Sequence, residues 1–536
     1  MKIPQHGGVA MARFKHYDYG QMKLIPVSFR QQILPGTFEY TLSYLIDHEV
    51  DLTVFEHRYC NDETGAPAYD PAILLKIILY AYSHGVTSSR RIERLCRENV
   101  VFMALSADSA PHFTTIADFI ARLDAEITAV FRDVLLVCEE AGLIGREMFA
   151  VDGVKLPSNA SKQWSGTRAD FAKKVEKMER AVRYLVRRHR EADDEAGEGD
   201  AQRAARAKQI DTLKRASRKV KAWLKQNGDK PGAGGRVRKS NITDNESAKM
   251  KTGKGVIQGY DGVTVTDARH QVVVHAAAYG EAQEHGLLIP MLEGTRENFR
   301  ALGGEDVLDQ VAVAADSGFH SEANVKYLFD SRIDGYLADT LFRKRDPRFA
   351  TAHRHVPTRP SAPWARPLKG KDGERLFLPR DFVHDHATHT CICPAGEFLY
   401  QSGAHCRIGG REAVRFKGAK RVCGPCALRT QCLRHPERTA VRQVAFFTGH
   451  SDKPETYTAK MKRKIDTEHG RYQYGRRLAV AEPVFASTCS ARGLKRFSHR
   501  GRRKVNTQWL LYCLVHNIGK VQRYGNLERR RRRKLQ

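Results

Sequence analysis

The chain has 536 residues, 41% of them hydrophobic, and Lys and Arg exceed Asp and Glu by 90 − 61 = 29. This length suffices for about two to four domains with a sizeable core. The charge excess indicates a polyanionic partner, most simply nucleic acid, against the alternative of an unusually basic soluble enzyme. No run approaches the roughly 18 apolar residues of a membrane-spanning helix, and no signal peptide is evident. We therefore expect a cytoplasmic protein with reduced cysteines and no membrane partner.

Residues 1–145 predict a helical domain that binds DNA. Asp70 and Pro71 supply an N-cap followed by proline at the first helical position, and Gly85 is suited to end that helix. A second helix follows from about Ser88, with arginines largely away from its apolar face. Such a basic face suits contact with a DNA backbone, and a solvated face on a packing helix explains it equally well.

Residues 146–342 change to alternating strands and helices, which predicts a mixed α/β sheet with helices packed on it. Two apolar runs, 148–153 and 306–318, predict buried strands. Each run ends in an acid followed by turn residues, Asp152 in the first and Asp316 in the second.

Two insertions interrupt this core. Within 165–230, two stretches with helical apolar spacing flank an acidic, glycine-containing loop, which predicts an antiparallel helical hairpin. Residues 343–450 are rich in Arg, His, Pro, Gly and Cys and form the second insertion. Helical character returns over 451–524 and completes the core, and a basic tail at 525–536 is of the kind that seeks nucleic acid.

Separated carboxylates that a fold brings together suit a two-metal phosphoryl-transfer site. Asp152 and Asp316 have the context of strand ends, and Glu482 would enter from a helix, although Pro483 disfavours helical geometry at that glutamate. Mg²⁺ prefers oxygen ligands of this kind. The alternative is that each acid only caps a turn. Spacing alone does not separate the three from Asp261, Asp267, Asp334 and Asp339.

Six of the 11 cysteines crowd between 391 and 432. One C-x-x-C pair with further cysteines within reach predicts a closed structural zinc site, and six free thiols in a reducing cell are the alternative. The preferred ligands are Cys393, Cys423, Cys426 and Cys432, with Cys406 and His435 as alternates. A zinc ion held in this way would be structural and distinct from the catalytic metal.

The order of these motifs resembles that of the DDE transposases of bacterial insertion sequences, whose catalytic fold is ribonuclease-H-like. The likeness covers nearly the whole chain. The segments that carry it are Tyr69–Tyr80, Ser88–Glu93, Phe113–Ala117, Val151–Gly153, Ala315–Phe319, Tyr474–Phe485, Leu494–Phe497 and Val505–Ile518.

The resemblance implies roles for residues of this chain. The metal-binding triad for two Mg²⁺ (or Mn²⁺) ions would be Asp152, Asp316 and Glu482. Tyr474 and Arg477 match a Tyr-x-x-Arg pair that handles transposon-end phosphates, a task that suits the bidentate guanidinium.

The spacing after this pair departs from the best-known form of the family signature. In that form three residues separate Arg from Glu, and a Lys or Arg follows the Glu after six more. Here four residues intervene, and the later position is Cys489. Lys495 is our candidate for the missing phosphate-binding cation, with Arg492 as the nearer alternative.

The resemblance also implies a function. The protein would bind the terminal inverted repeats of its element, cut the double-stranded DNA and join the ends to target DNA. A homodimer is expected, because two ends must be paired, and the protein would act at the bacterial nucleoid. Two alternatives remain: a ribonuclease-H-like nuclease that does not join ends, and a non-catalytic, zinc-containing DNA-binding regulator.

Overall fold

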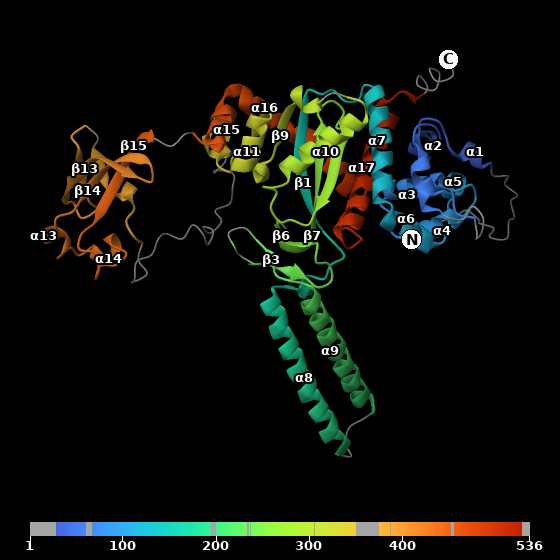
Figure 1. The fold of residues 1–536 in the computed structure, drawn as a ribbon, viewed down its shortest axis with the longest axis horizontal. Helices are drawn as coiled ribbons and strands as arrows, with labels where there is room; N and C mark the ends of the chain where they lie inside the picture. The colour runs from blue at the N-terminus through green and yellow to red at the C-terminus, as the bar shows by residue number, and fades with distance from the viewer. Residues whose placement is uncertain are drawn as a thin grey trace, which may run out of the picture.

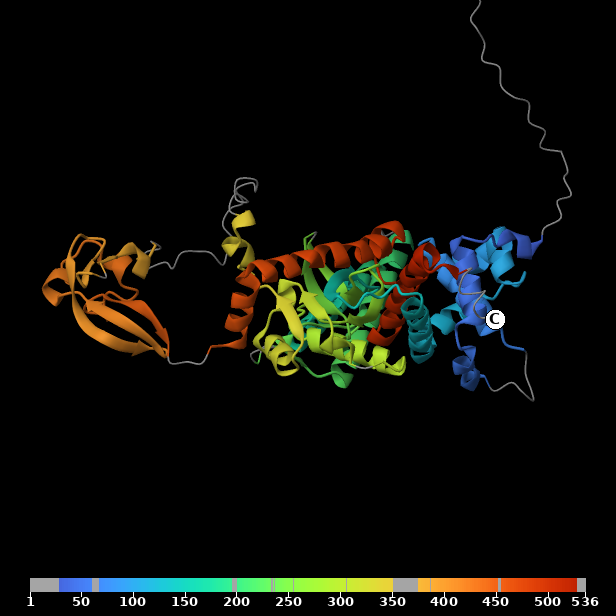
Figure 2. The same cartoon turned by 90° about the horizontal axis from the view of Figure 1, so that it is seen from above.

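The computed structural model describes residues 28–59, 67–194, 200–232, 235, 237–253, 255–304, 306–349, 375–385, 387–451 and 455–527. The molecule is elongated, with the N-terminal helices at one end, a mixed sheet in the middle and a small β unit at the other end (Figures 1 and 2). A pair of long helices projects from the middle (Figure 1). The expected mixed α/β class is confirmed.

The N-terminal part is helical, as predicted. Its helices are α1 (Phe29–Gln32), α2 (Phe38–His48), α3 (Pro71–Ser83), α4 (Ser89–Glu98), α5 (Val100–Leu105), α6 (Phe113–Arg122) and α7 (Asp124–Glu140). Asp70 caps α3 by accepting a hydrogen bond from the Ala72 N–H, and Pro71 is its first residue. Gly85 follows α3 with a φ of 70°, a left-handed conformation that glycine adopts without strain.

The central sheet combines parallel and antiparallel strands. They are β1 (Met148–Pro157), β6 (Ala248–Thr252), β7 (Gly255–Asp267), β8 (Val273–Tyr279), β9 (Ala312–Ala315) and β10 (Asp334–Leu337). The order is β10-β9-β1-β7-β6, and β8 also pairs with β7. β1 runs parallel to β9 and antiparallel to β7, and β9 runs parallel to β10.

Two strand predictions are corrected. The predicted turn at Asp152–Gly153 is wrong, because β1 continues through both residues to Pro157, held by antiparallel pairing with β7 as far as Gly259. The strand predicted over 306–318 is confined to β9, and a 3₁₀ turn, η4 (Val307–Asp309), precedes it.

Helices cover both faces of this sheet. They are α10 (Leu288–Ala301), α11 (Glu322–Asp330), α12 (Phe342–Arg345), α15 (Tyr457–Asp466), α16 (Glu468–Phe485) and α17 (Arg502–Tyr524). On one face, Phe149 of β1 stacks on Phe299 of α10. On the other face, Trp509 of α17 lies against Gly262 of β7.

The buried helix α17 joins the sheet to the N-terminal helices. The Trp509 Nε1–H donates to the Val263 carbonyl at 3.1 Å, and the Asn517 side chain bonds both backbone groups of Val273 on β8. The same helix packs against α3 and α7. The sheet and the N-terminal helices therefore share one continuous hydrophobic core.

The interpretation that Pro483 disfavours helix at Glu482 is wrong. α16 continues through Pro483 to Phe485, and a π-helical segment, η10 (Ala486–Ala491), follows directly. Irregular helical turns of this kind relieve local strain in the hydrogen-bond ladder and are frequent at functional sites.

The predicted helical hairpin is observed as α8 (Arg168–Asp194) and α9 (Asp200–Gln226), which project from the sheet as an arm (Figure 1). Its base has a small core that includes Phe171 and Trp223, whose rings meet edge to face. Short strands flank it: β2 (Ser165–Gly166), β3 (Lys230–Pro231), β4 (Val237–Arg238) and β5 (Ser240–Asn241).

The cysteine-rich segment forms a five-stranded antiparallel sheet with its own core around Phe416. Its elements are β11 (Val383–Asp385), β12 (Thr390–Ile392), β13 (Phe398–Ile408), β14 (Arg411–Lys417), α13 (Lys420–Cys423), α14 (Arg429–Cys432) and β15 (Gln443–Ser451). Within the described ranges, no helix combines the length and apolar character that crossing a bilayer requires. Residues 528–536 of the predicted basic tail lie outside the described residues.

Candidate active site

The register of two neighbouring strands brings Asp152 and Asp316 together. β1 and β9 run parallel, and their last paired residues are Val151 and Ala315. Asp152 follows Val151 within β1, and Asp316 follows Ala315 directly after the end of β9. Because the two strands pair side by side, this register makes two residues that are far apart in the sequence adjacent.

A buried arginine of α16 lies between the two aspartates. Arg477 is 7% exposed. Its Nη1 lies 2.5 Å from Asp152 Oδ2, and its Nη2 lies 3.6 Å from Asp316 Oδ1. The Arg477 guanidinium also lies 5.7 Å from the centre of the Tyr474 ring, which packs edge to face against Phe342 of α12. The structure therefore brings the side chains of four predicted site residues together: Asp152, Asp316, Tyr474 and Arg477.

The pKa shifts show how strongly these groups depend on one another. Burial raises the pKa of Asp152, and this effect outweighs the opposing influence of Arg477 and of the Gly153 N–H. Burial lowers the pKa of Arg477, but the charges of Asp152 and Asp316 outweigh it and leave that pKa raised. The guanidinium thus offsets part of the repulsion that two carboxylates create when they share a partly buried site.

Glu482 lies apart from this ion-paired group. It follows Arg477 by five residues on α16, which turns its side chain about 140° around the helix from Arg477. Glu482 is exposed, whereas Ala481, one turn after Arg477, is fully buried. Its role as third metal ligand stays a prediction.

Lys495 is also outside this region. It is exposed and lies in the irregular segment between η10 and α17. Its proposed contact with DNA phosphate stays a prediction.

The opposite face of the sheet holds a second group of charges, which the sequence did not single out as a unit. Lys155 of β1 pairs in register with Asp261 of β7, and its Nζ lies 2.5 Å from Glu284 Oε1. Asp261 is fully buried, and neither of its carboxylate oxygens has a hydrogen-bond partner in the described chain. A Cβ on Gly153 would lie 2.7 Å from Asp261 Oδ1, which places Asp261 on the face away from Asp152.

This environment raises the pKa of the Asp261 carboxyl group. Burial and the nearby Glu284 raise its pKa to about 8, although Lys155 opposes the shift. The signal in the sequence was the acid itself, set in the middle of β7 and flanked there by uncharged residues from Gly255 to Thr266. Glu284 had no comparable signal, because its loop context is ordinary.

The three remaining alternative aspartates have structural partners. Asp267 accepts hydrogen bonds from the backbone N–H groups of Gly145, Arg146 and Arg269. Two other aspartates form ion pairs, Asp334 with Lys464 and Asp339 with Arg345. Each of these three acids therefore has a structural partner in the folded chain.

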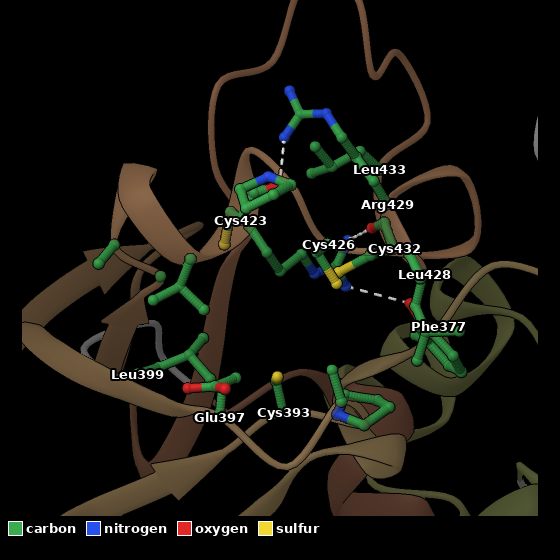
Figure 3. Close-up of a pocket in the computed structure, with 18 of the residues that line it drawn as sticks. Phe377, Cys393, Glu397, Leu399, Cys423, Cys426, Leu428, Arg429, Cys432 and Leu433 are labelled. Atoms are coloured by element: carbon green, nitrogen blue, oxygen red, sulfur yellow. Dashed lines mark hydrogen bonds between the residues drawn. The ribbon is translucent and has the colours of Figure 1, made fainter.

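The four preferred zinc ligands line one cavity of about 260 Å³ in the cysteine-rich unit, as Figure 3 shows for Cys393, Cys423, Cys426 and Cys432. Burial raises the pKa of the Cys432 thiol to about 11, and the nearby thiols of Cys423, Cys393 and Cys426 raise it further. Cys406 and His435, the alternates, do not line this cavity. In the described part of the chain, no three His, Cys, Asp or Glu side chains converge closely enough to hold a metal ion.

Two family models match the chain. One, described as Transposase DDE domain, matches residues 392–522, and the other, described as Transposase domain (DUF772), matches residues 27–122. Over these two segments the chain is similar to transposases, and this similarity supports the resemblance to DDE transposases of insertion sequences. No curated protein matches it. The DDE match contains Tyr474, Arg477 and Glu482 but neither Asp152 nor Asp316, so the part assigned to those aspartates depends on their geometry.

We predict that Asp261→Asn changes how the stability of this protein depends on pH. The pKa of Asp261 is about 8 in the folded protein against an ordinary 3.8. The folded state then binds the proton more tightly than the unfolded state, so stability falls as pH rises between these values. The variant should match the wild type near pH 4 and exceed it by a few kcal/mol above pH 8, measured by urea unfolding.

The matched control is Asp309→Asn, at an exposed position of η4. It should leave the pH profile of the wild type unchanged. Parallel profiles for Asp261→Asn and the wild type would show that Asp261 carries no raised pKa.

Proposed function

We propose that this transposase cleaves DNA at the ends of its element and joins those ends to target DNA, in a reaction that depends on Mg²⁺. The observation that carries the proposal is the adjacency of Asp152 and Asp316 on the neighbouring strands β1 and β9, with the buried Arg477 between them. The two transposase family matches support the coarser function. The sheet, antiparallel over β1, β7 and β8 and parallel over β9 and β10, supports a ribonuclease-H-like core.

The carboxylates of Asp152 and Asp316 are the kind of donor that divalent metal ions prefer. Arg477 acts there as a stand-in cation, since its two nitrogens approach one oxygen of each aspartate. Carboxylate oxygens are the ligands that Mg²⁺ prefers. Asp152 and Asp316 would hold the metal ions, and Glu482 would supply the third carboxylate. When bound, two such ions activate the attacking hydroxyl and stabilise the leaving oxygen.

Arg477 and Tyr474 would bind and orient the DNA end. A guanidinium forms paired hydrogen bonds to phosphate as readily as to carboxylate, so the fork that now contacts the aspartates also suits a phosphate. The Tyr474 ring packs between Phe342 and Arg477 and would restrict the side-chain conformations open to the arginine. Lys495, exposed after η10, would add a further phosphate contact.

Exposed positive charge lies where a long duplex could meet it. On α4, four arginines are exposed: Arg90, Arg91, Arg94 and Arg97. On the projecting arm, helix α9 carries seven exposed basic residues: Lys208, Lys214, Arg215, Arg218, Lys219, Lys221 and Lys225. Contacts of this kind position a protein on DNA without reading its sequence. The proposed partners are the terminal inverted repeats and target DNA, bound by a homodimer at the nucleoid.

We further propose a structural zinc ion held by the cysteines that share the cavity of the 375–451 unit. Four thiols are a donor set that zinc prefers. Arg429 donates a hydrogen bond to the Cys423 carbonyl, and Arg442 donates one to the Cys432 carbonyl. Both arginines line the same cavity, and their bonds hold the backbone of two of the proposed ligands. The ion would stabilise a unit whose own hydrophobic core is small.

Asp152→Asn should abolish cleavage and leave DNA binding intact. The substrate is a duplex that carries the sequences flanking the reading frame in its genome, incubated with Mg²⁺. Since partners of metal ligands already contribute about 10–100-fold, loss of a ligand should slow cleavage by at least about 100-fold. Asp316→Asn and Glu482→Gln should behave alike.

The matched controls are Asp309→Asn and Glu468→Gln, both at exposed positions, the second at the start of α16. Cleavage by Asp152→Asn at the rate of the wild type would contradict the proposed metal site. Cleavage without joined products would identify a nuclease that does not join ends, and Mg²⁺-independent binding without nicking would identify a DNA-binding regulator.

Purified wild-type protein should contain about one zinc per chain, since four thiols satisfy one closed tetrahedral site. Cys423→Ser should lose that zinc and melt at lower temperature, because metal binding in such units is coupled to folding. Zinc content by mass spectrometry and thermal unfolding measure both effects. Cys406→Ser, outside the cavity, should retain the metal. Zinc retained by Cys423→Ser would overturn the proposed ligand set.

A further inference from the structure

A second cavity, of about 710 Å³, lies where the N-terminal helices meet α17 and η10. Phe38 and His84 line it from the N-terminal side, and Pro483 lines it from the end of α16. The residue before Pro483 is Glu482. The cavity therefore opens beside the helix that carries Arg477 and Glu482, yet shares no lining residue with the aspartate site.

The cavity carries positive charge that nothing in its wall offsets. Arg492, Lys520 and Arg523 line it, and its lining includes no Asp or Glu. Burial lowers the pKa of His516 to about 3, so this lining histidine is neutral. Burial, with Arg523 and Arg492 nearby, lowers the pKa of Lys520 to about 8. Three cations gathered without a counter-charge are costly unless an anion joins them.

Neutral groups hold two of these cations in place. The Arg492 Nη1 donates to the Ser487 carbonyl at 3.3 Å, and Lys520 Nζ donates to Gln271 Oε1 at 2.9 Å. Glycine makes room for the arginine, because a Cβ on Gly519 would lie 3.2 Å from Arg492 Nη2. The site is thus built from several elements, and no acid takes part in positioning it.

The size and lining of the cavity favour a nucleotide unit over a lone phosphate. A water molecule occupies about 30 Å³ in the liquid, so the cavity holds far more than one small anion. Its wall includes Phe38 and Tyr524. Aromatic rings beside cations are the means by which proteins hold a nucleotide's base and phosphate together.

We propose that this cavity binds one nucleotide of the DNA strand, with its phosphate held by Arg492, Lys520 and Arg523. The proposal builds on the proposed function, in which DNA already lies against α16. It adds a contact formed jointly by the N-terminal helices and the core. DNA bound there would contact both the N-terminal helices and the end of α16, the helix that carries Arg477.

The test is the salt dependence of DNA binding, measured by fluorescence anisotropy with the end duplex in EDTA. Each phosphate contact contributes about −0.9 to the slope of log K against log salt concentration. Lys520→Gln and Arg523→Gln should each make the slope shallower by about that amount. The control Lys326→Gln, at an exposed position of α11, should leave it unchanged.

Because this assay needs neither metal nor cleavage, its result is independent of the Asp152→Asn experiment. Unchanged slopes for both cavity variants would overturn the proposal, as would an equal change in Lys326→Gln. A further measurement uses inorganic phosphate as the ligand. If it raised the melting temperature of the wild type but not of Lys520→Gln, while the DNA slopes stayed equal, the cavity would bind free phosphate and the assignment to DNA would be wrong.

Discussion

The contact between one buried guanidinium and two carboxylates organises the candidate active site of this protein. Arg477 ties α16 to the adjacent strands β1 and β9, because Asp152 and Asp316 follow the last paired residues of those strands. Two carboxylates without this cation would repel each other in a partly buried site. Divalent ions would meet the same requirement for positive charge, so the arginine lies where the proposed metal ions would bind.

The sequence predicted those features that depend on local patterns. Helical periodicity located the arm of α8 and α9, and the Asp70-Pro71 pair located the start of α3. Strand-like runs located Asp152 and Asp316. The sequence could not show that Asp152 lies within a strand instead of at a turn, because the pairing of β1 with β7 depends on a partner more than a hundred residues away.

Tertiary context explains what the sequence missed at the site. The pairing of Arg477 with the aspartates required the β1–β9 register, which no local pattern encodes. Asp261 gained its raised pKa from burial and from Glu284, so only the assembled fold distinguishes it from other aspartates. The direction of Glu482 depends on α16 continuing through Pro483, where proline normally disfavours helix. The cationic cavity likewise joins segments that are remote in sequence.

The most direct test of the account is Mn²⁺ binding, followed by electron paramagnetic resonance. If Arg477 occupies the place of the metal, Arg477→Gln should bind Mn²⁺ at least about tenfold more tightly, a gain of about 1.4 kcal/mol, whereas Asp152→Asn should lose binding. Arg476→Gln, beside it and paired with Glu147 instead, should behave as the wild type. Mn²⁺ affinity that is unchanged by Arg477→Gln and by Asp152→Asn would contradict the account.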